Sequence, residues 1–229
     1  MYITATHLTT NTSATDATSY NTASITPTAR RLVLAAVYSR CTNPPASPSL
    51  SGNGLTWVVV ATKVSADNLG RLTLYRALIT STTSTGAVAI SFGAVEQLRC
   101  GWSIAEFAGI DIGGANGANA IVQSATAIAD PGNSITTTLA AFASLNNATY
   151  GAMAQHSADV TNITEGSGFT MLGEDFNSGE QLAIASEFKA TNDTGVDFTT
   201  DDSTAGRYSL GIAVEIRIAV GGAFLLNFV

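Results

Sequence analysis

The sequence predicts an all-β protein, namely an antiparallel β-sandwich of the jelly-roll or concanavalin-like kind built from two pseudo-repeats. Short segments rich in Val, Ile, Thr and aromatic residues are bounded by Gly, Asn, Asp and Ser, which is the composition of strands and turns. The same order of segments occurs twice along the chain. No window shows a capped apolar stripe with the helical period, so we expect no long helix.

Two kinds of strand differ in their apolar pattern. Leu210–Ile216 alternates large apolar side chains with Gly, Ala and Glu, which is the period-two pattern of a strand with one buried face. Leu32–Val37 is apolar on both faces, which predicts a central strand that is packed on both sides. The best helical candidate, Leu139–Leu145, is too short for more than a turn or two.

The repeat is recognised from six ordered pairs of segments, offset by roughly 110 residues, within residues of about 22–110 and about 132–217. Small insertions and deletions in loops account for the drift in the offset. The pairs are Ser24–Thr26 with Ser134–Thr136, Arg31–Arg40 with Ala148–Ser157, Gly54–Trp57 with Gly168–Met171, Arg71–Leu78 with Gln181–Ala190, Gly86–Phe92 with Gly195–Phe198, and Gly101–Phe107 with Leu210–Ile216.

The domain organisation that we favour is a single β-sandwich over residues 1–217, in which the two repeats interleave across two sheets. The link Asp111–Asn119 between the repeats is short and rich in Gly and Asn, and Ala120–Ile128 belongs clearly to neither repeat. Two small sandwiches in tandem are the alternative. Residues 218–229 are expected to form an apolar docking tail.

The composition argues against several classes of protein. Hydrophobic residues make up 45% of the 229 residues and charged residues only 12%, so the surface must be largely neutral and rich in hydroxyl groups. The net charge is −7, and the ten Lys and Arg residues are mostly scattered singly, which argues against nucleic-acid binding. No apolar run is long enough to cross a bilayer, so we expect no membrane partner.

The N-terminal segment Met1–Thr12 lacks the basic and apolar regions of a secretory signal peptide. Lysine occurs only at positions 63 and 189, which is common in proteins that work outside the cell. This combination is expected of a secreted chain trimmed of its signal, or of a virion protein that is made in a host cytoplasm and released by lysis.

No pattern of reactive residues predicts an enzyme. His7 and His156 are the only histidines, and neither lies in a Ser-His-Asp or Gly-x-Ser-x-Gly context. The His and Cys clusters that bind zinc and the Asp-x-Asp-x-Asp-Gly loop that binds calcium are absent from the sequence. We therefore expect no catalytic, cofactor-binding or metal-binding residues and no cofactor, and we interpret the clustered acids of the second repeat as solvated loops.

Cys41 and Cys100 are placed so that a disulfide between them can be proposed. Cys41 follows the segment Arg31–Arg40, and Cys100 precedes Gly101–Phe107. If these two segments pair as antiparallel strands, the end of one lies opposite the start of the other, within reach of a disulfide. The alternative is a pair of buried thiols.

Two carboxylates at matching positions of the repeats suggest a structural ion pair that occurs twice. We expect Arg76 to pair with Glu106, and Lys189 to pair with Glu215, because a buried carboxylate needs a partner. The functional alternative makes Glu106 a glycosidase acid, but that chemistry needs a second carboxylate across a cleft. We favour the structural interpretation.

The segment after Arg217 is strongly apolar and follows a Gly221–Gly222 pair. Such a segment should not lie in water. We expect it to dock either on its own sandwich or, as we favour, on a neighbouring subunit by strand addition. The assembly residues would be Phe224, Leu225, Leu226, Phe228 and Val229.

Four runs resemble sequences of tailed-phage virion structural proteins. They are LVLAAVYSR (Leu32–Arg40), SGNGLTW (Ser51–Trp57), RLTLYRAL (Arg71–Leu78) and GWSIAEFAGID (Gly101–Asp111). Proteins of this kind are jelly-roll or lectin-like sandwiches that decorate heads or build tail and fibre parts. The resemblance therefore implies a virion structural protein, a capsid-decorating or tail-associated subunit that forms a homo-oligomer and binds other virion proteins. It carries over no catalytic residue.

Two other functions remain open. The first is a secreted or surface carbohydrate-binding module, which would present exposed aromatic side chains to a glycan. Its candidate residues Trp57, Trp102, Tyr75 and Phe107 lie in strand patterns that predict burial. The second, a sandwich hydrolase, is disfavoured because the reactive patterns described above are missing.

Overall fold

The computed structural model describes residues 2–42, 44–157, 159–177, 181–202 and 207–219. These residues form sixteen strands in four antiparallel sheets and one short 3-10 segment, η1 (Ala115–Ala120). The predicted all-β sandwich class is confirmed. Among the described residues, no helix is both long and apolar enough to cross a membrane.

The first repeat contains eight strands in two sheets. A five-stranded sheet has the order β1-β8-β3-β6-β5, and a three-stranded sheet has the order β2-β7-β4. The strands are β1 (Thr4–Ser13), β2 (Ser19–Asn21), β3 (Leu32–Arg40), β4 (Ser49–Ser51), β5 (Val58–Val64), β6 (Gly70–Leu78), β7 (Ala89–Ser91) and β8 (Arg99–Ala108).

The second repeat has the same topology. Its five-stranded sheet, taken from the β9 edge, has the order β9-β16-β11-β14-β13, and its three-stranded sheet has the order β10-β15-β12. The strands are β9 (Ile121–Ala129), β10 (Ser134–Thr138), β11 (Ala148–Gln155), β12 (Ile163–Glu165), β13 (Thr170–Asn177), β14 (Leu182–Lys189), β15 (Gly195–Thr200) and β16 (Ser209–Ile216).

Every strand of the first repeat has an equivalent eight positions later in the strand order, so the repeat is complete. The order β1-β8-β3-β6 opposite β2-β7-β4 is that of a jelly roll, except that β5 pairs with β6 and not with β4, which makes the sheets five- and three-stranded. Residues 120–128, which the sequence pattern leaves unassigned, form most of β9 and are the counterpart of β1.

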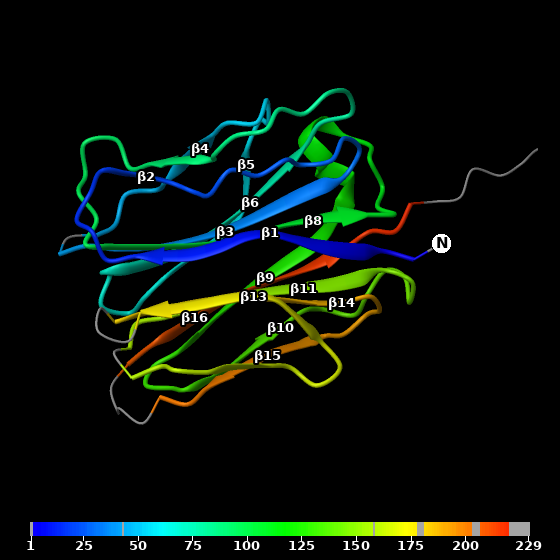
Figure 1. Ribbon diagram of the computed structural model, residues 1–229. Helices are drawn as coiled ribbons and strands as arrows, with labels where there is room; N and C mark the ends of the chain where they lie inside the picture. The colour runs from blue at the N-terminus through cyan, green and yellow to red at the C-terminus, as the bar shows by residue number, and fades with distance from the viewer. Residues whose placement is uncertain (1, 43, 158, 178–180, 203–206, 220–229) are drawn as a thin grey trace, which may run out of the picture.

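The sheets are stacked in four layers (Figure 1). The two five-stranded sheets face each other in the middle, and each three-stranded sheet covers one outer face. Each sheet takes its strands from one repeat alone, so the prediction that the repeats interleave across two sheets is wrong.

The central strands bury both of their faces, as their apolar pattern predicts. In β3, Leu32, Leu34 and Tyr38 face the other repeat, whereas Val33 and Val37 face the three-stranded sheet of their own repeat. The described residues therefore form three apolar cores. We call the one between the repeats the central core, and the other two the outer cores.

The two repeats meet across a pseudo-twofold axis. Strand β1 packs on β13 and β8 on β14, and the equivalent pairs β9 on β5 and β16 on β6 are also in contact. Each repeat thus uses the same surface to meet the other, as the subunits of a twofold-symmetric dimer do. The central core is an isologous interface within one chain.

Candidate functional site

Glu106 is buried on the β8 face that points into the outer core of the first repeat. Its Oε1 accepts hydrogen bonds from Arg31 Nη1 at 2.7 Å and from Thr28 Oγ1 at 2.9 Å, and its Oε2 accepts one from Thr28 N at 2.7 Å. These donors lie in the segment that leads into β3. The carboxylate therefore fixes the entry into the central strand of its sheet.

Glu215 fixes the entry into the central strand of the second repeat, and its hydrogen-bond partners are neutral. Its Oε1 accepts from Asn147 Nδ2 at 2.6 Å and from Ala143 N at 3.0 Å, and its Oε2 accepts from Gln123 Nε2 at 2.7 Å. Residues 143 and 147 lie in the segment that leads into β11. Glu106 and Glu215 thus have equivalent roles, because each fixes the segment that leads into the central strand of its own sheet.

The predicted ion pairs Arg76–Glu106 and Lys189–Glu215 are both wrong. Arg76 alternates with residues of the outer core, so it lies on the opposite face of the sheet from Glu106. Lys189 and Glu215 lie on the same face of their sheet, but on the two strands that flank Thr149. Two strand spacings therefore separate them. Lys189 instead lies 2.6 Å from Asp193.

Of the two possibilities for Cys41 and Cys100, the structure has the pair of buried thiols and not the disulfide. Cys100 pairs with Ser39, and the β3–β8 register ends at Arg40. Beyond that point the backbone N–H of Cys41 donates to Leu69 O at 3.1 Å, so the chain turns toward the β5–β6 hairpin. Burial raises the pKa of the Cys100 thiol well above its ordinary value.

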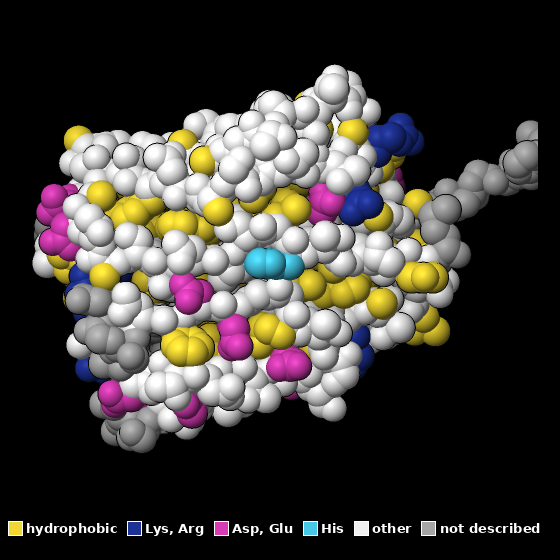
Figure 2. All heavy atoms as spheres, in the orientation of Figure 1, with side chains coloured by type: hydrophobic (Ala, Val, Ile, Leu, Met, Phe, Trp, Pro, Cys, Tyr) yellow, Lys and Arg dark blue, Asp and Glu magenta, His cyan; other side chains and the backbone are white. Residues whose placement is uncertain are grey.

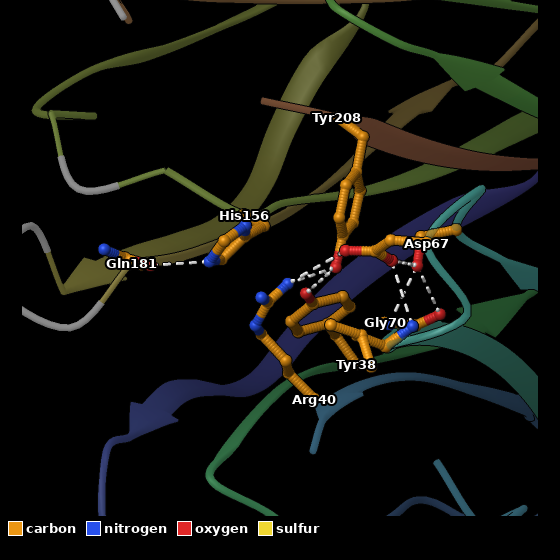
Figure 3. Close-up of polar contacts among 9 residues, drawn as sticks. Tyr38, Arg40, Asp67, Gly70, His156, Gln181 and Tyr208 are labelled. Carbon is orange, nitrogen blue, oxygen red and sulfur yellow. Dashed lines mark hydrogen bonds and ion pairs between the residues drawn. The ribbon is translucent and has the colours of Figure 1, made fainter. Parts of the chain in front are cut away.

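A polar cluster joins the two repeats at one end of the central core, and we call it the seam cluster (Figure 3). The hydroxyl groups of Tyr38 and Tyr208 lie 3.0 Å apart, and Arg40 Nη1 donates to Tyr208 Oη at 3.0 Å. The same guanidinium lies 3.5 Å from Asp67. Its members are Tyr38, Arg40, Asp67, His156, Gln181 and Tyr208.

Two members of the seam cluster occupy equivalent positions of the two repeats. Arg40 is the last residue of β3, His156 directly follows β11 at the equivalent position, and each reaches the hairpin beside its own strand. His156 Nε2 lies 2.6 Å from Gln181 Oε1, and its ring stacks at 5.5 Å on Tyr208. Burial and the nearby Arg40 lower the pKa of His156 to about 4. The neutral ring therefore donates to the Gln181 carbonyl at neutral pH.

Gly70 makes room for the tyrosine of the seam cluster. A Cβ atom at this position would lie 2.1 Å from Tyr208 Oη. Tyr38 is completely buried, and its burial raises the pKa of its hydroxyl group well above the ordinary value. The cluster thus links the un-ionised hydroxyl group of Tyr38 to Tyr208 and to a paired guanidinium, and these contacts hold the two repeats together.

A chain of hydroxyl groups runs inward from the face that carries β1 and β13. His7 Nε2 lies 2.9 Å from Thr10 Oγ1, which lies 2.9 Å from Ser103 Oγ, and Ser103 Oγ lies 2.7 Å from Ser186 Oγ. Partial burial lowers the pKa of His7. The face itself is mostly uncharged, with a histidine at its centre and separate acidic groups below it (Figure 2).

Close packing of the two edge strands makes this chain of hydroxyl groups possible. A Cβ on Gly173 of β13 would lie 2.3 Å from Thr10 Oγ1, so only glycine lets the strands approach this closely. Ser103 and Ser186 are completely buried, out of reach of a substrate. The arrangement joins the repeats, as the seam cluster does.

Glu187 is a functional candidate that the sequence pattern did not reveal. It lies in β14, is completely buried, and points into the outer core of the second repeat. Its Oε2 accepts a hydrogen bond from Gly166 N at 2.8 Å, whereas its Oε1 has no hydrogen-bond partner among the described residues. Burial, with smaller effects of Asp197 and Glu165, raises the pKa of Glu187 to about 8.

The aromatic residues proposed for sugar binding do not form an exposed platform. Trp102, Tyr75 and Phe107 are only 2%, 3% and 0% exposed. Trp57 is half-buried against the outer core of the first repeat, and its indole nitrogen is inaccessible. The apolar residues of the proposed tail lie outside the described residues, so their placement stays a prediction.

Within the described parts of the chain, no three residues of the His, Cys, Asp and Glu types come together in a way that could hold a metal ion. Comparison of the chain with protein-family models, with curated proteins and with solved structures finds no match.

Proposed function

We propose that this protein is a virion structural subunit, either capsid-decorating or tail-associated, that works by assembling with other virion proteins and with copies of itself. The observation that carries the proposal is that the buried polar side chains bind other parts of the same chain. Glu106 and Glu215 fix the entries into the central strands, and the seam cluster and the hydroxyl chain join the repeats. Each of these groups holds the chain together.

The fold supports the same proposal by analogy. Jelly rolls occur in viral capsid proteins and in lectin domains, so the fold is one that particle subunits use. Two jelly rolls stacked on their five-stranded sheets also give a rigid block, in which the outer sheets and the edge strands are left for neighbours. A largely neutral surface suits close packing between subunits, because few charges have to be desolvated.

The oligomeric state tests this proposal. We expect the full chain to be an oligomer by size-exclusion chromatography with light scattering, and a variant that lacks residues 221–229 to be a monomer. If the truncated variant is still an oligomer, residues 221–229 are not needed for assembly. A full chain that stays monomeric at every concentration would contradict assembly itself.

Carbohydrate binding is the alternative proposal. Since the aromatic candidates are buried, it would have to use other groups, and Tyr2, at 73% exposed, is the aromatic residue most accessible among those described. Binding of the chain to a glycan array that is lost in Tyr2→Ala would favour this alternative.

A further inference from the structure

The five-stranded sheets leave four long edge strands, and these differ in how well they are protected from pairing. Strands β1 and β5 form the edges of one sheet, and β9 and β13 form the edges of the other. An edge strand presents backbone N–H and C=O groups that can pair with another chain. Natural proteins prevent such pairing with bulges, charges or proline at the edge.

Three of the four edges carry such protection. The register of β1 is broken between His7 and Thr9, and that of β5 between Val59 and Ala61. Strand β5 also carries Lys63. Strand β13 is interrupted between Met171 and Gly173, and Glu174 and Asp175 follow the break.

Strand β9 lacks this protection. Its only register shift lies at its start, near Ile121, and Gln123–Ala129 pairs with β16 without a break. The strand has no charged residue and no proline. The side-chain amide of Gln123 bonds Ala140 N at 3.0 Å and Ala140 O at 3.1 Å, which covers the first part of the edge. Ser124–Ala129 is therefore the longest unprotected edge among the described strands of the two large sheets.

We infer that the outer edge of β9 accepts residues 223–229 of a second copy of this chain as an added antiparallel strand. The inference rests on the proposed assembly function and names its docking surface. The seven residues 223–229 (AFLLNFV) have no charged side chain, and they are long enough to pair along the six residues of Ser124–Ala129. Backbone hydrogen bonds would supply affinity, and the alternating Phe and Leu side chains would supply apolar contact.

The place where the described chain ends favours a second copy over the chain's own β9. Arg217 N donates to Ala120 O, and Ala219 N donates to Gly109 O, both at 2.8 Å, so residues 217–219 lie beside the start of β9. From there the segment could run along its own β9 only in the parallel direction. Parallel pairing is less stable per residue than antiparallel pairing. A second copy allows the antiparallel pairing.

A charge on the edge tests the inference. Thr126 is exposed on β9, and Thr126→Lys should abolish the oligomer seen by light scattering, because an edge lysine resists pairing. Asn11→Lys is the matched control, since it places the same charge on an exposed position of the β1 edge. It should leave the oligomer intact. Unchanged circular dichroism and melting temperature in both variants would show that the fold is retained.

The outcomes separate this inference from the proposed function. If the variant that lacks residues 221–229 is a monomer while Thr126→Lys stays an oligomer, the segment assembles the protein elsewhere and the β9 site is wrong. If Asn11→Lys and Thr126→Lys both dissociate, the effect is not specific to β9 and the site is also wrong. If the unmodified chain is monomeric, the proposed function fails first.

A disulfide supplies a second and positive test. The native cysteines are buried, so new ones can be introduced selectively. A chain with Ser124→Cys and Asn227→Cys should form a covalent dimer on mild oxidation, and reduction should reverse it. The control pair Asn11→Cys and Asn227→Cys should stay monomeric on a denaturing gel. Equal crosslinking in both pairs, or none in the first, would overturn the inference.

Discussion

At the scale of single residues, Glu187 makes the stability of the protein depend on pH. Its carboxyl group is buried with one oxygen unpartnered, and its pKa in the folded protein is raised to about 8, against about 4.3 in an unfolded chain. Between these values the folded state binds more protons than the unfolded state. The contribution of Glu187 is therefore fully present below about pH 4 and is lost as the pH rises through about 8.

This predicts the behaviour of Glu187→Gln. The amide is neutral at every pH, so the variant should lose the decline in unfolding free energy that the native protein shows from about pH 5 to about pH 8, on the order of 5 kcal/mol at most. Urea denaturation at intervals across this range measures the slope. Equal slopes in the two proteins would show that Glu187 is not held protonated.

The two matched carboxylates identified from the sequence have structural roles, but the ion pairs predicted for them are wrong. Glu106 and Glu215 are buried at equivalent positions, as the repeat suggested, and each accepts hydrogen bonds from the segment that leads into a central strand. The partners were missed because the alignment matched Arg76 with Lys189. The strand pairing instead aligns Lys189 with Ala77, since these two face Thr149 and Val33. A slip of one residue moves a side chain to the other face of a sheet, and sequence similarity this low cannot detect it.

At the scale of elements, the hairpin between β5 and β6 is shaped by the other repeat. Ser65 and Gly70 close the hairpin with a backbone hydrogen bond of 2.9 Å, and Asn68 takes a positive φ of 56° that asparagine tolerates. Gly70 then lies directly under the hydroxyl group of Tyr208. The hairpin is thus fitted to a side chain that lies far away in the sequence.

Replacing that glycine should disturb the seam cluster. Gly70→Ala places a methyl group against Tyr208 and should cost about 1–3 kcal/mol of unfolding free energy, the usual range for overpacking. Tyr208→Phe removes the nearest atom, so the double variant should lose less than the sum of the two single variants. A double-mutant cycle in urea measures this coupling. Strictly additive losses would mean that the two residues do not meet.

Strands were predictable from the sequence, whereas their allocation to sheets was not. Alternation and turn residues indicate where strands such as Leu210–Ile216 begin and end. An apolar pattern on both faces shows that Leu32–Val37 is packed on both sides. It does not show which sheet packs against each face of the strand. Interleaved and stacked repeats bury the same faces. Only the pairing register separates the two arrangements.

At the scale of the whole molecule, the two halves of the central core differ in chemistry despite the pseudo-twofold axis. Ser103 and Ser186 are hydrogen-bonded on one side, whereas the equivalent positions on the other side are Ile212 and Leu74. The polar side lies under the protected edges β1 and β13. The apolar side lies under β5 and β9, where we place the docking edge. The repeats have thus kept one fold while their two sides have diverged.

The mass of the assembled protein tests the central claim most directly. Native mass spectrometry of the full chain at micromolar concentration should show integral multiples of 23.5 kDa, since the account makes this protein an assembly subunit. A single species of 23.5 kDa at every concentration, from a chain shown to be folded, would contradict that account.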